Sequence, residues 1–254
     1  MNQPRAAELR LSVIVPAWNE GQNLRQLVPA LIRLEELHEV IVVEAAPDPA
    51  TAQIVRASGG LYLPFAAPNR GAQMNLGAEH ATGDVFIFHH ADSVLSAEHL
   101  GSLRRALADQ AIIGGAFHRR FDDRHSWLRP LEPVARVMSR YGGNCFGDQS
   151  IFVRREVFCA LGGFASIPLM EDMEFSRRLR GAGKIVVLDP PIISSGRRHC
   201  ARGAWRTSLE NGLFIALYKC GCSPARLHRW YYRERFSSPN ESMVIAPVEE
   251  TPPR

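Results

Sequence analysis

Acidic side chains follow three of the apolar, β-branched segments in the first half of the chain. Glu20 comes shortly after the first segment, Glu44 ends the second, and Asp92 lies four residues after the last. If these segments are parallel strands, their carboxyl ends meet at the rim of an open sheet where ligands bind. We therefore expect the three carboxylates to share that rim. For Glu20, or for Asp48 in the next loop, a second interpretation is a helix cap or first-turn acid.

Asp92 has neighbours that suit a divalent cation. His90 and Ser93 flank it, and a lone carboxylate of this kind can hold Mg²⁺ or Mn²⁺ together with substrate phosphates. The pair His89-His90 also suggests zinc, but adjacent strand residues point to opposite faces, so at most one can join Asp92. The alternative is that Ser93 or Ser96 caps the following helix and Asp92 only assists.

Two helix starts carry further polar groups. Residues 70–75 (RGAQMN) open a predicted helix with Arg70 and Gly71, and a helix N-terminus beside an arginine can hold a diphosphate. The sequence contains neither GxGxxG nor GxxxxGK[ST], so it does not support dinucleotide or Walker-type phosphate binding.

Residues 171–174 place three acids in the first turn of another predicted helix. The helix dipole alone favours acids there, and the functional interpretation is that one of them faces the cleft as a general base. Neighbouring helical residues point about 100° apart, so we expect Glu171 and Asp172 to differ in role.

Strand and helix patterns alternate along the chain, which predicts an α/β fold with a mostly parallel, doubly wound sheet. The expected strands are 11–15, 40–43, 61–64, 84–88, 112–121, 149–153 and 184–188, the last broken by Asp189-Pro190-Pro191. The expected helices are 20–37, a short one ending at 57, 70–80, 127–139, 171–181, 203–220 and 224–236.

Composition places the chain among ordinary globular proteins. It has 254 residues, 46% hydrophobic and 22% charged, with a net charge of +4. Five cysteines without a CxxC pair fit a reducing, cytoplasmic location, and no apolar stretch reaches the length of a membrane span. We expect residues 1–10 to be a leader without signal-peptide character, 11–236 to be one domain, and 237–254 to be a disordered tail.

Several segments, taken together, resemble the family 2 glycosyltransferases with the GT-A fold. They are Val13-Ile14-Val15-Pro16, Asn19-Glu20, 40–44 (VIVVE), Arg70-Gly71, Gly83-Asp84, His90-Ala91-Asp92 and Glu171-Asp172. Others resemble short soluble bacterial members of arsenosugar or carotenoid-acid type: 114–117 (GGAF), 147–149 (GDQ), 151–155 (IFVRR), 161–164 (LGGF), 167–172 (IPLMED) and 195–198 (SGRR).

The resemblance implies a donor site. Pro16 and Glu20 would line the nucleoside pocket, and Arg70 and Gly71 would approach the diphosphate. Glu44 stands where the family usually has an aspartate that hydrogen-bonds uracil, so the extra methylene bears on base preference. The loop after Glu44 also lacks the family's usual Asp-Gly-Ser pattern.

The resemblance further implies a metal and a base. Asp92 matches the last acid of the DxD motif, which binds Mg²⁺ or Mn²⁺ with the donor phosphates, while His90 replaces the first acid and would lie beside the donor. Asp172 matches the catalytic base, and Glu171 lies beside it.

Four polar residues are candidates for contacts to the acceptor or to phosphate: Asp148, Gln149, Arg197 and Arg198. His199 follows where an aromatic residue is expected. It is either a further metal ligand or an ordinary surface histidine.

The expected activity is transfer of a sugar, with UDP-glucose as the first candidate donor, to a hydroxyl or carboxylate of a small-molecule or lipid acceptor. A single displacement with one base inverts the anomeric configuration. We expect no nucleic-acid partner. The alternatives are a non-catalytic nucleotide- or sugar-binding module and a sugar-phosphate nucleotidyltransferase, although 16–20 (PAWNE) is not the Gly-rich signature of the latter.

Residues 227–236 mix arginine with aromatic residues. This pattern is compatible with peripheral contact with an anionic membrane face, or with a closing helix that packs Trp230 and Tyr231 on the core.

Overall fold

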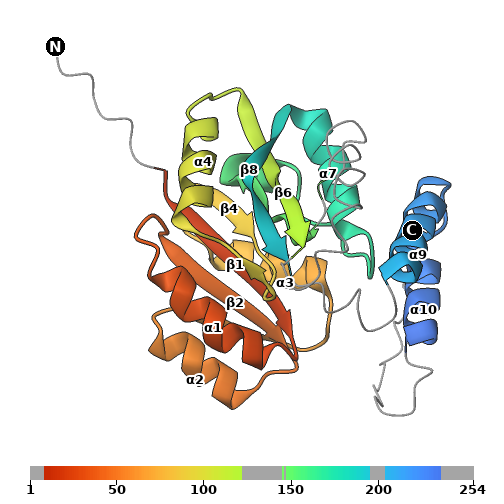
Figure 1. The fold of residues 1–254 in the computed structure, drawn as a ribbon, viewed down its shortest axis with the longest axis horizontal. Helices are drawn as coiled ribbons and strands as arrows, with labels where there is room; N and C mark the ends of the chain where they lie inside the picture. The colour runs from red at the N-terminus through yellow and green to blue at the C-terminus, as the bar shows by residue number, and fades with distance from the viewer. Residues whose placement is uncertain (1–8, 122–144, 146, 195–203, 236–254) are drawn as a thin grey trace.

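The computed structural model describes residues 9–121, 145, 147–194 and 204–235, and its centre is one eight-stranded sheet (Figure 1). The strands run in the order β3-β2-β1-β4-β7-β6-β8-β5. Their bounds are β1 Leu11–Trp18, β2 Glu39–Ala45, β3 Leu61–Phe65, β4 Val85–Phe88, β5 Ser93–Val94, β6 Ile112–Phe121, β7 Ile151–Arg154 and β8 Lys184–Ser194. The predicted α/β architecture is confirmed.

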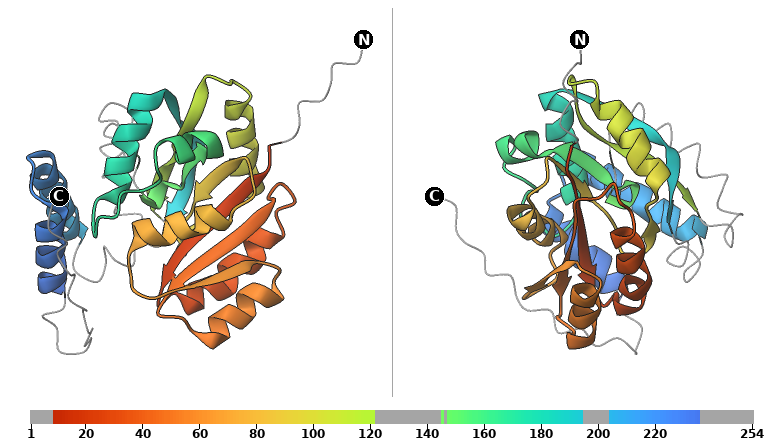
Figure 2. Two further views of the ribbon diagram at one scale, coloured as in Figure 1. Left: turned by 180° about the vertical axis from the view of Figure 1, so that it is seen from behind. Right: turned by 90° about the vertical axis from the view of Figure 1, so that its left-hand side faces the viewer.

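The first half of the sheet is parallel and lies between two layers of helices (Figure 2). Its strands are apolar on both sides, so successive residues such as Val13 and Ile14 enter different cores. One core contains buried side chains of α1 (Gly21–Ile32), α2 (Pro49–Ala57) and α4 (Ala97–Leu107). The other contains side chains of α3 (Arg70–His80), α6 (Arg155–Ala160) and α7 (Glu171–Ala182).

The strand β7 runs in the opposite direction to the strands on either side of it. It runs antiparallel to both β4 and β6, with Phe88 opposite Ile151. Because β7 begins where β4 ends, the short helix η2 (Gly147–Gln149), just before β7, lies at the rim formed by the carboxyl ends of the parallel strands. Residues from both halves of the chain therefore meet at one edge.

The prediction that β8 stops at Asp189-Pro190-Pro191 is wrong. The strand continues to Ser194 because it pairs with β6 through an irregularity. Leu188 lies opposite Phe117 and Ile192 opposite Arg119, so residues 189–191 bulge out of the ladder. A proline lacks the N–H that a ladder position needs, and a bulge removes that requirement.

Other boundaries also differ from the predictions. The helix predicted over 20–37 ends at Ile32, and β7 starts two residues later than expected. The predicted helix over 127–139 lies outside the described residues.

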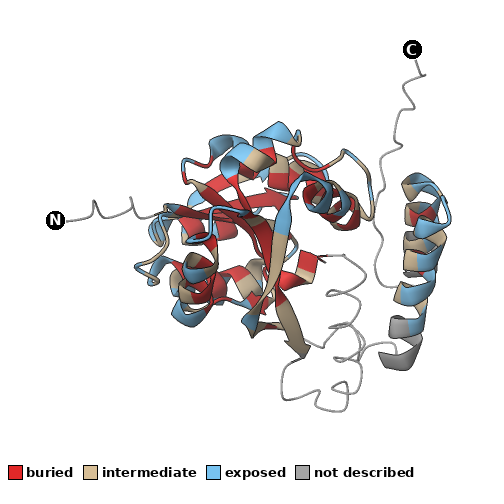
Figure 3. Cartoon of the chain, turned by 90° about the horizontal axis from the view of Figure 1, so that it is seen from above, coloured by how far each residue is buried: buried red, intermediate tan, exposed pale blue. Residues whose placement is uncertain are grey.

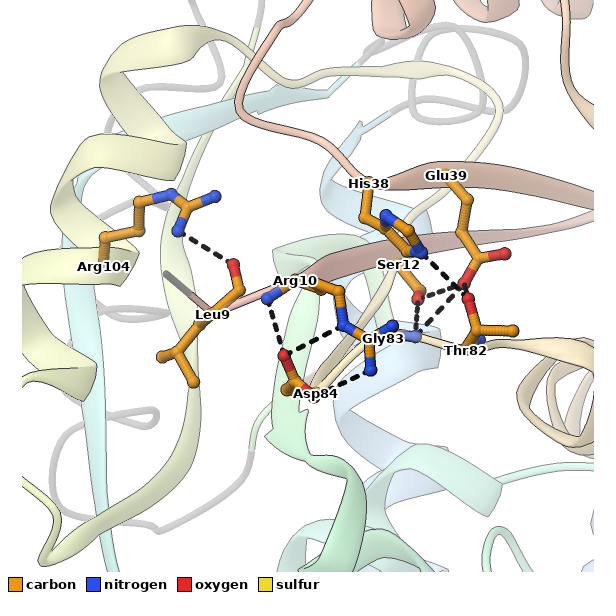
Figure 4. Close-up of polar contacts among 9 residues, drawn as sticks. All are labelled: Leu9, Arg10, Ser12, His38, Glu39, Thr82, Gly83, Asp84 and Arg104. Carbon is orange, nitrogen blue, oxygen red and sulfur yellow. Dashed lines mark hydrogen bonds and ion pairs between the residues drawn. The ribbon is translucent and has the colours of Figure 1, made fainter. Parts of the chain in front are cut away.

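Glu39 joins the amino ends of the parallel strands (Figure 4). Its carboxylate accepts hydrogen bonds from the Ser12 hydroxyl at 2.7 Å and from the backbone N–H groups of Thr82 at 2.6 Å and Gly83 at 3.2 Å. These bonds connect β1, β2 and the turn before β4 on the side of the sheet opposite the carboxyl-end rim.

A second contact lies beside it. Asp84 accepts from the backbone N–H of Arg10 at 2.8 Å and from the Arg10 guanidinium at 3.2 Å. On the adjacent helix, Arg104 donates to the Leu9 carbonyl at 2.8 Å (Figure 4). The entry of the chain into β1 is thereby fixed to β4 and α4.

The last two described helices, α9 (Ala204–Lys219) and α10 (Pro224–Arg235), lie side by side beyond α7 and away from the sheet (Figures 1 and 3). Across the described residues, no helix combines the length and apolar character needed to cross a membrane.

Candidate active site

The carboxyl ends of β1 and β2 are held together by a buried side chain of α3. Gln73 donates from its amide nitrogen to the carbonyl oxygens of Ala17 and Val43, both at 2.8 Å. The sequence patterns did not predict a role for Gln73. It lies three residues after Arg70 on α3, and this helical spacing is the feature of the sequence that could have indicated its place at the strand ends.

Arg70 is the centre of the site. Its Nε donates to Glu171 Oε1 at 2.6 Å, its Nη2 to Asp172 Oδ2 at 3.2 Å, and its Nη1 contacts His90 Nε2 at 2.9 Å. Because a guanidinium only donates, His90 accepts this bond through Nε2. Burial alone would lower the pKa of Arg70, but Glu171 and Asp172 outweigh it and raise the pKa.

Glu171 and Asp172 do not point apart as their places on a helix suggested. Both reach the same guanidinium, from side chains that are 7% and 15% exposed. Asp172 Oδ2 also accepts from the Gly147 backbone N–H at 2.8 Å. Burial raises the pKa of Asp172, Arg70 opposes that rise, and Glu171 adds to it. A carboxyl group with a raised pKa suits proton transfer.

Two glycines allow this close arrangement. A Cβ on Gly71 would lie 3.0 Å from the Ala165 carbonyl oxygen and 3.4 Å from Glu171 Cβ, so the start of α3 packs directly on the segment that leads into α7. A Cβ on Gly147 would overlap the guanidinium of Arg70. Gly71 therefore has a packing reason in addition to the diphosphate role expected for it.

Asp148 forms an ion pair with Arg119 of β6, a partner that the sequence patterns did not identify. Burial raises the pKa of Asp148, but the charge and hydrogen bond of Arg119 and the charge of Arg70 outweigh it and lower the pKa. Asp148 is thus held ionised near Arg70, and the adjacent Gln149 is buried.

Glu44 is only 1% exposed and is held in place from two sides. The Tyr62 hydroxyl donates to its Oε2 at 2.7 Å, and the Asp48 N–H donates to the same oxygen at 3.3 Å. Asp48 itself caps α2, because its side chain accepts a hydrogen bond from the Thr51 N–H at 3.2 Å. The interpretation of Asp48 as a helix cap is therefore the one that the structure supports. Pro16 and Glu20 are half-buried on and after β1, at the same rim.

The two histidines after β4 have different environments. His89 is fully buried, with Nδ1 at 2.7 Å from the Ser150 hydroxyl and Nε2 at 3.1 Å from the Ser93 carbonyl. Burial lowers its pKa to about 4, so the ring is neutral, and both of its nitrogens are already engaged by Ser150 and Ser93. His90 faces Arg70 instead.

Asp92 is half-buried at the rim, and its carboxylate has no hydrogen bond or ion pair to any described residue. No cluster of three histidine, cysteine or acidic side chains suited to a metal occurs among the described residues. One carboxylate fits Mg²⁺ or Mn²⁺ when substrate phosphates supply most of the other ligands. Ser96 begins α4, as the alternative interpretation expected.

The segment leading into α7 is fixed from two directions. Asn75 of α3 exchanges two hydrogen bonds with the backbone of Phe164, at 2.8 and 2.9 Å. Met170, directly before Glu171, has a φ of 68°, which is uncommon and strained for a residue with a side chain. This geometry presents both acids to Arg70. Arg197, Arg198 and His199 lie outside the described residues.

The open α/β sheet carries carboxylates and an arginine at its carboxyl rim, the edge at which proteins with such sheets bind their ligands. A sequence model described as "Glycosyl transferase family 2" matches residues 12–165, which is more than half of the chain. The chain belongs to this family. The match ends before Glu171 and Asp172.

Relatives and solved structures agree with this. The chain is 32% identical over 148 residues to 4,4'-diaponeurosporenoate glycosyltransferase of Staphylococcus haemolyticus (strain JCSC1435), covering 55% of this chain and 40% of that protein. The match thus spans less than half the length of that relative.

Among solved structures, S. aureus TarS 1-349 superposes with a TM-score of 0.58 at 17% identity, covering 91% of this chain and 74% of that one. TarS 1-349 in complex with UDP-GlcNAc gives 0.57 at 20% identity, covering 74% and 58%. These similarities confirm the predicted GT-A fold.

Proposed function

We propose that this chain is an inverting, metal-dependent glycosyltransferase that moves a sugar from a UDP-sugar donor to an acceptor hydroxyl or carboxylate. The observation that carries the proposal is the contact of one guanidinium, Arg70, with both Glu171 and Asp172 at the rim where β1, β2 and β4 end. The family match and the UDP-GlcNAc complex of TarS support the class of donor.

Asp172 is the proposed base. With a hydroxyl acceptor, the oxygen attacks the anomeric carbon, its proton passes to Asp172, the bond from that carbon to the phosphate oxygen breaks, and UDP leaves. One displacement inverts the anomeric centre. In the arrangement described here Arg70 and Gly147 both donate to Asp172 Oδ2, so this oxygen is already engaged. A donor diphosphate that attracts Arg70 would release Asp172 Oδ2 from its bond with the guanidinium.

Asp92 would hold a Mg²⁺ or Mn²⁺ ion, which when bound supplies charge neutralisation for the donor phosphates. The half-buried carboxylate of Asp92, which makes no hydrogen bond or ion pair within the described part of the chain, supports this assignment. His90 is proposed to lie beside the donor because it already orients Arg70. Pro16, Glu20 and Glu44 remain the proposed contacts to the nucleoside.

The test is release of UDP from a panel of UDP-sugars, beginning with UDP-glucose and UDP-N-acetylglucosamine, with and without Mn²⁺. We expect metal-dependent cleavage of one donor and an inverted anomer by NMR. Metal-dependent binding without any cleavage would instead favour the non-catalytic binding module. Incorporation of a sugar phosphate into a nucleotide would favour the nucleotidyltransferase.

A further inference from the structure

The paired helices α9 and α10 carry an exposed apolar surface that the proposed reaction does not use. Leu209 and Leu213, one helical turn apart on α9, are 77% and 49% exposed, and Trp230 of α10 is 43% exposed. These are three of the six large apolar side chains exposed in the described part of the chain. Exposed apolar side chains that occur together mark an interaction surface more often than scattered ones do, and these three lie on two adjacent helices.

The pair has its own small core, which explains why these side chains are left outside. Phe214 and Leu227 are 5% and 1% exposed, and the Phe214 ring centroid lies 5.5 Å from those of both Trp230 and Tyr231. The two α10 aromatics therefore pack on Phe214 of α9, and not on the core of the sheet as the closing-helix alternative expected. Trp230 remains 43% exposed despite this contact.

The net positive charge of the chain lies in the same two helices. Residues 204–235 contain six basic and two acidic residues, a net charge of +4, which equals the net charge of the whole chain. The remaining residues therefore sum to zero. Arg226 and Arg229 of α10 and Lys219 at the end of α9 are exposed. A basic surface with apolar side chains is complementary to an anionic lipid surface.

The pair also lies near the proposed base. Burial raises the pKa of Tyr218 in the last turn of α9, and the charges of Glu174 and Asp172 on α7 raise it further. The end of α9 is therefore within electrostatic range of Asp172. A surface bound by this pair would lie beyond α7, the helix whose first turn carries Asp172 (Figure 1).

We propose that α9 and α10 dock this protein on an anionic membrane surface, with Leu209, Leu213 and Trp230 among the upper acyl chains and the arginines at the head groups. Membrane docking is independent of the transfer reaction. Its consequence, an acceptor carried by the lipid phase and delivered to Asp172, rests on the proposed function.

The test is co-sedimentation of the full chain, without donor, with vesicles of phosphatidylcholine alone or mixed with phosphatidylglycerol, at low and high salt. We expect binding to the anionic vesicles at low salt only. Replacing Leu209→Gln together with Leu213→Gln should lower the partition coefficient about tenfold. Arg226→Gln with Arg229→Gln should lower it by about fivefold for each arginine.

Matched controls use residues of similar exposure elsewhere. Leu61→Gln on β3, where Leu61 is 40% exposed, and Arg25→Gln with Arg105→Gln should leave binding unchanged. Absence of binding by the wild-type protein, or equal weakening by the controls, overturns the proposal. It is equally overturned if light scattering shows that the paired leucine variant dissociates a dimer and leaves vesicle binding intact.

UDP release in solution separates this proposal from the proposed function. The leucine variants should cleave donor at the wild-type rate. If the wild-type protein binds vesicles and no UDP-sugar is cleaved, the transfer reaction fails while membrane docking stands.

Discussion

At the scale of single residues, the main feature of the site is that one guanidinium serves two acids. Arg70 binds Glu171 through Nε and Asp172 through Nη2, so the residue expected at the diphosphate is also the partner of the proposed base. Sequence reasoning found all three residues but not their contact, because Arg70 and Asp172 are 102 positions apart and share no pattern.

Asp172→Asn should bind donor and metal nearly as well as wild type and lose most transfer, because the amide cannot take the proton. Removal of a general base typically costs ~10²–10⁴-fold in rate. Glu171→Gln should mainly weaken donor binding, since Glu171 holds Arg70. Product formation at saturating donor and donor affinity are measured separately. An inactive Glu171→Gln with an active Asp172→Asn would reverse the assignment.

The pH dependence of transfer should follow Asp172. A base acts when deprotonated, so the acid limb of kcat/KM lies above the usual range of an aspartate because burial raises the pKa. Arg70→Met removes the charge that lowers this pKa, and the limb should move up by about 1–3 pH units. Arg70→Lys keeps the charge and should leave the limb nearly unchanged. An NMR titration of the Asp172 carboxyl checks the same shift without turnover, and no shift would exclude this coupling.

Asp92→Ala should abolish Mn²⁺-dependent UDP binding and leave the fold intact, because the half-buried carboxylate makes no hydrogen bond or ion pair with another described residue. Calorimetric titration with and without Mn²⁺ measures the effect, and circular dichroism checks the fold. Unchanged metal-dependent affinity would rule out Asp92 as the metal ligand.

At the scale of elements, the site depends on how closely helix starts and loops approach one another. Gly147→Ala places a Cβ against the Arg70 guanidinium, which can move aside at little cost in stability. We expect at least a tenfold loss of transfer with a melting temperature close to wild type. Gly101→Ala on α4, where the nearest atom is 3.4 Å away at a side-chain end, should keep activity and gain about 0.5–1 kcal/mol. Equal activity of both variants would contradict the role given to Gly147.

The bounds of strands and helices could be predicted from the sequence where the side chains of the element itself determine its structure. The strand 112–121 and the helix 70–80 were predicted with their observed bounds because their patterns are local. The passage of β8 through two prolines was not, since it depends on a bulge opposite β6 that only the paired strand reveals. The same holds for Met170, whose φ of 68° turns the chain into α7 with no glycine to signal it.

At the scale of the whole molecule, the two ends of the parallel strands have separate tasks. The carboxyl ends carry the site, and the amino ends are joined through Glu39 and Asp84 (Figure 4). Substitutions at the amino ends should therefore change stability without changing the chemistry.

Glu39 should contribute to stability at neutral pH and lose that contribution in acid. Burial raises its pKa, but the hydrogen bonds from Ser12, Thr82 and Gly83 outweigh burial and lower it. A lowered pKa stabilises the fold above the unfolded value of about 4.3, and the effect disappears as pH falls through the folded value. Glu39→Gln should cost about 1 kcal/mol at pH 7 and much less near pH 3, by urea unfolding. Glu79→Gln, at an exposed position of α3, is the control. A loss that is the same at both pH values would contradict the linkage.

The antiparallel strand β7 has a consequence for the order of folding. Strands β1 to β4 and their helices span residues 11–88, whereas the ion pair of Arg70 with Asp172 joins groups that are 102 positions apart, with β7 between them in the chain. Loops that close over long separations form late because their entropy cost precedes any contact energy. A refolding intermediate that contains only the parallel strands would have native-like secondary structure and no catalytic centre. Recovery of transfer activity would then mark the last step of folding, later than recovery of the helical signal.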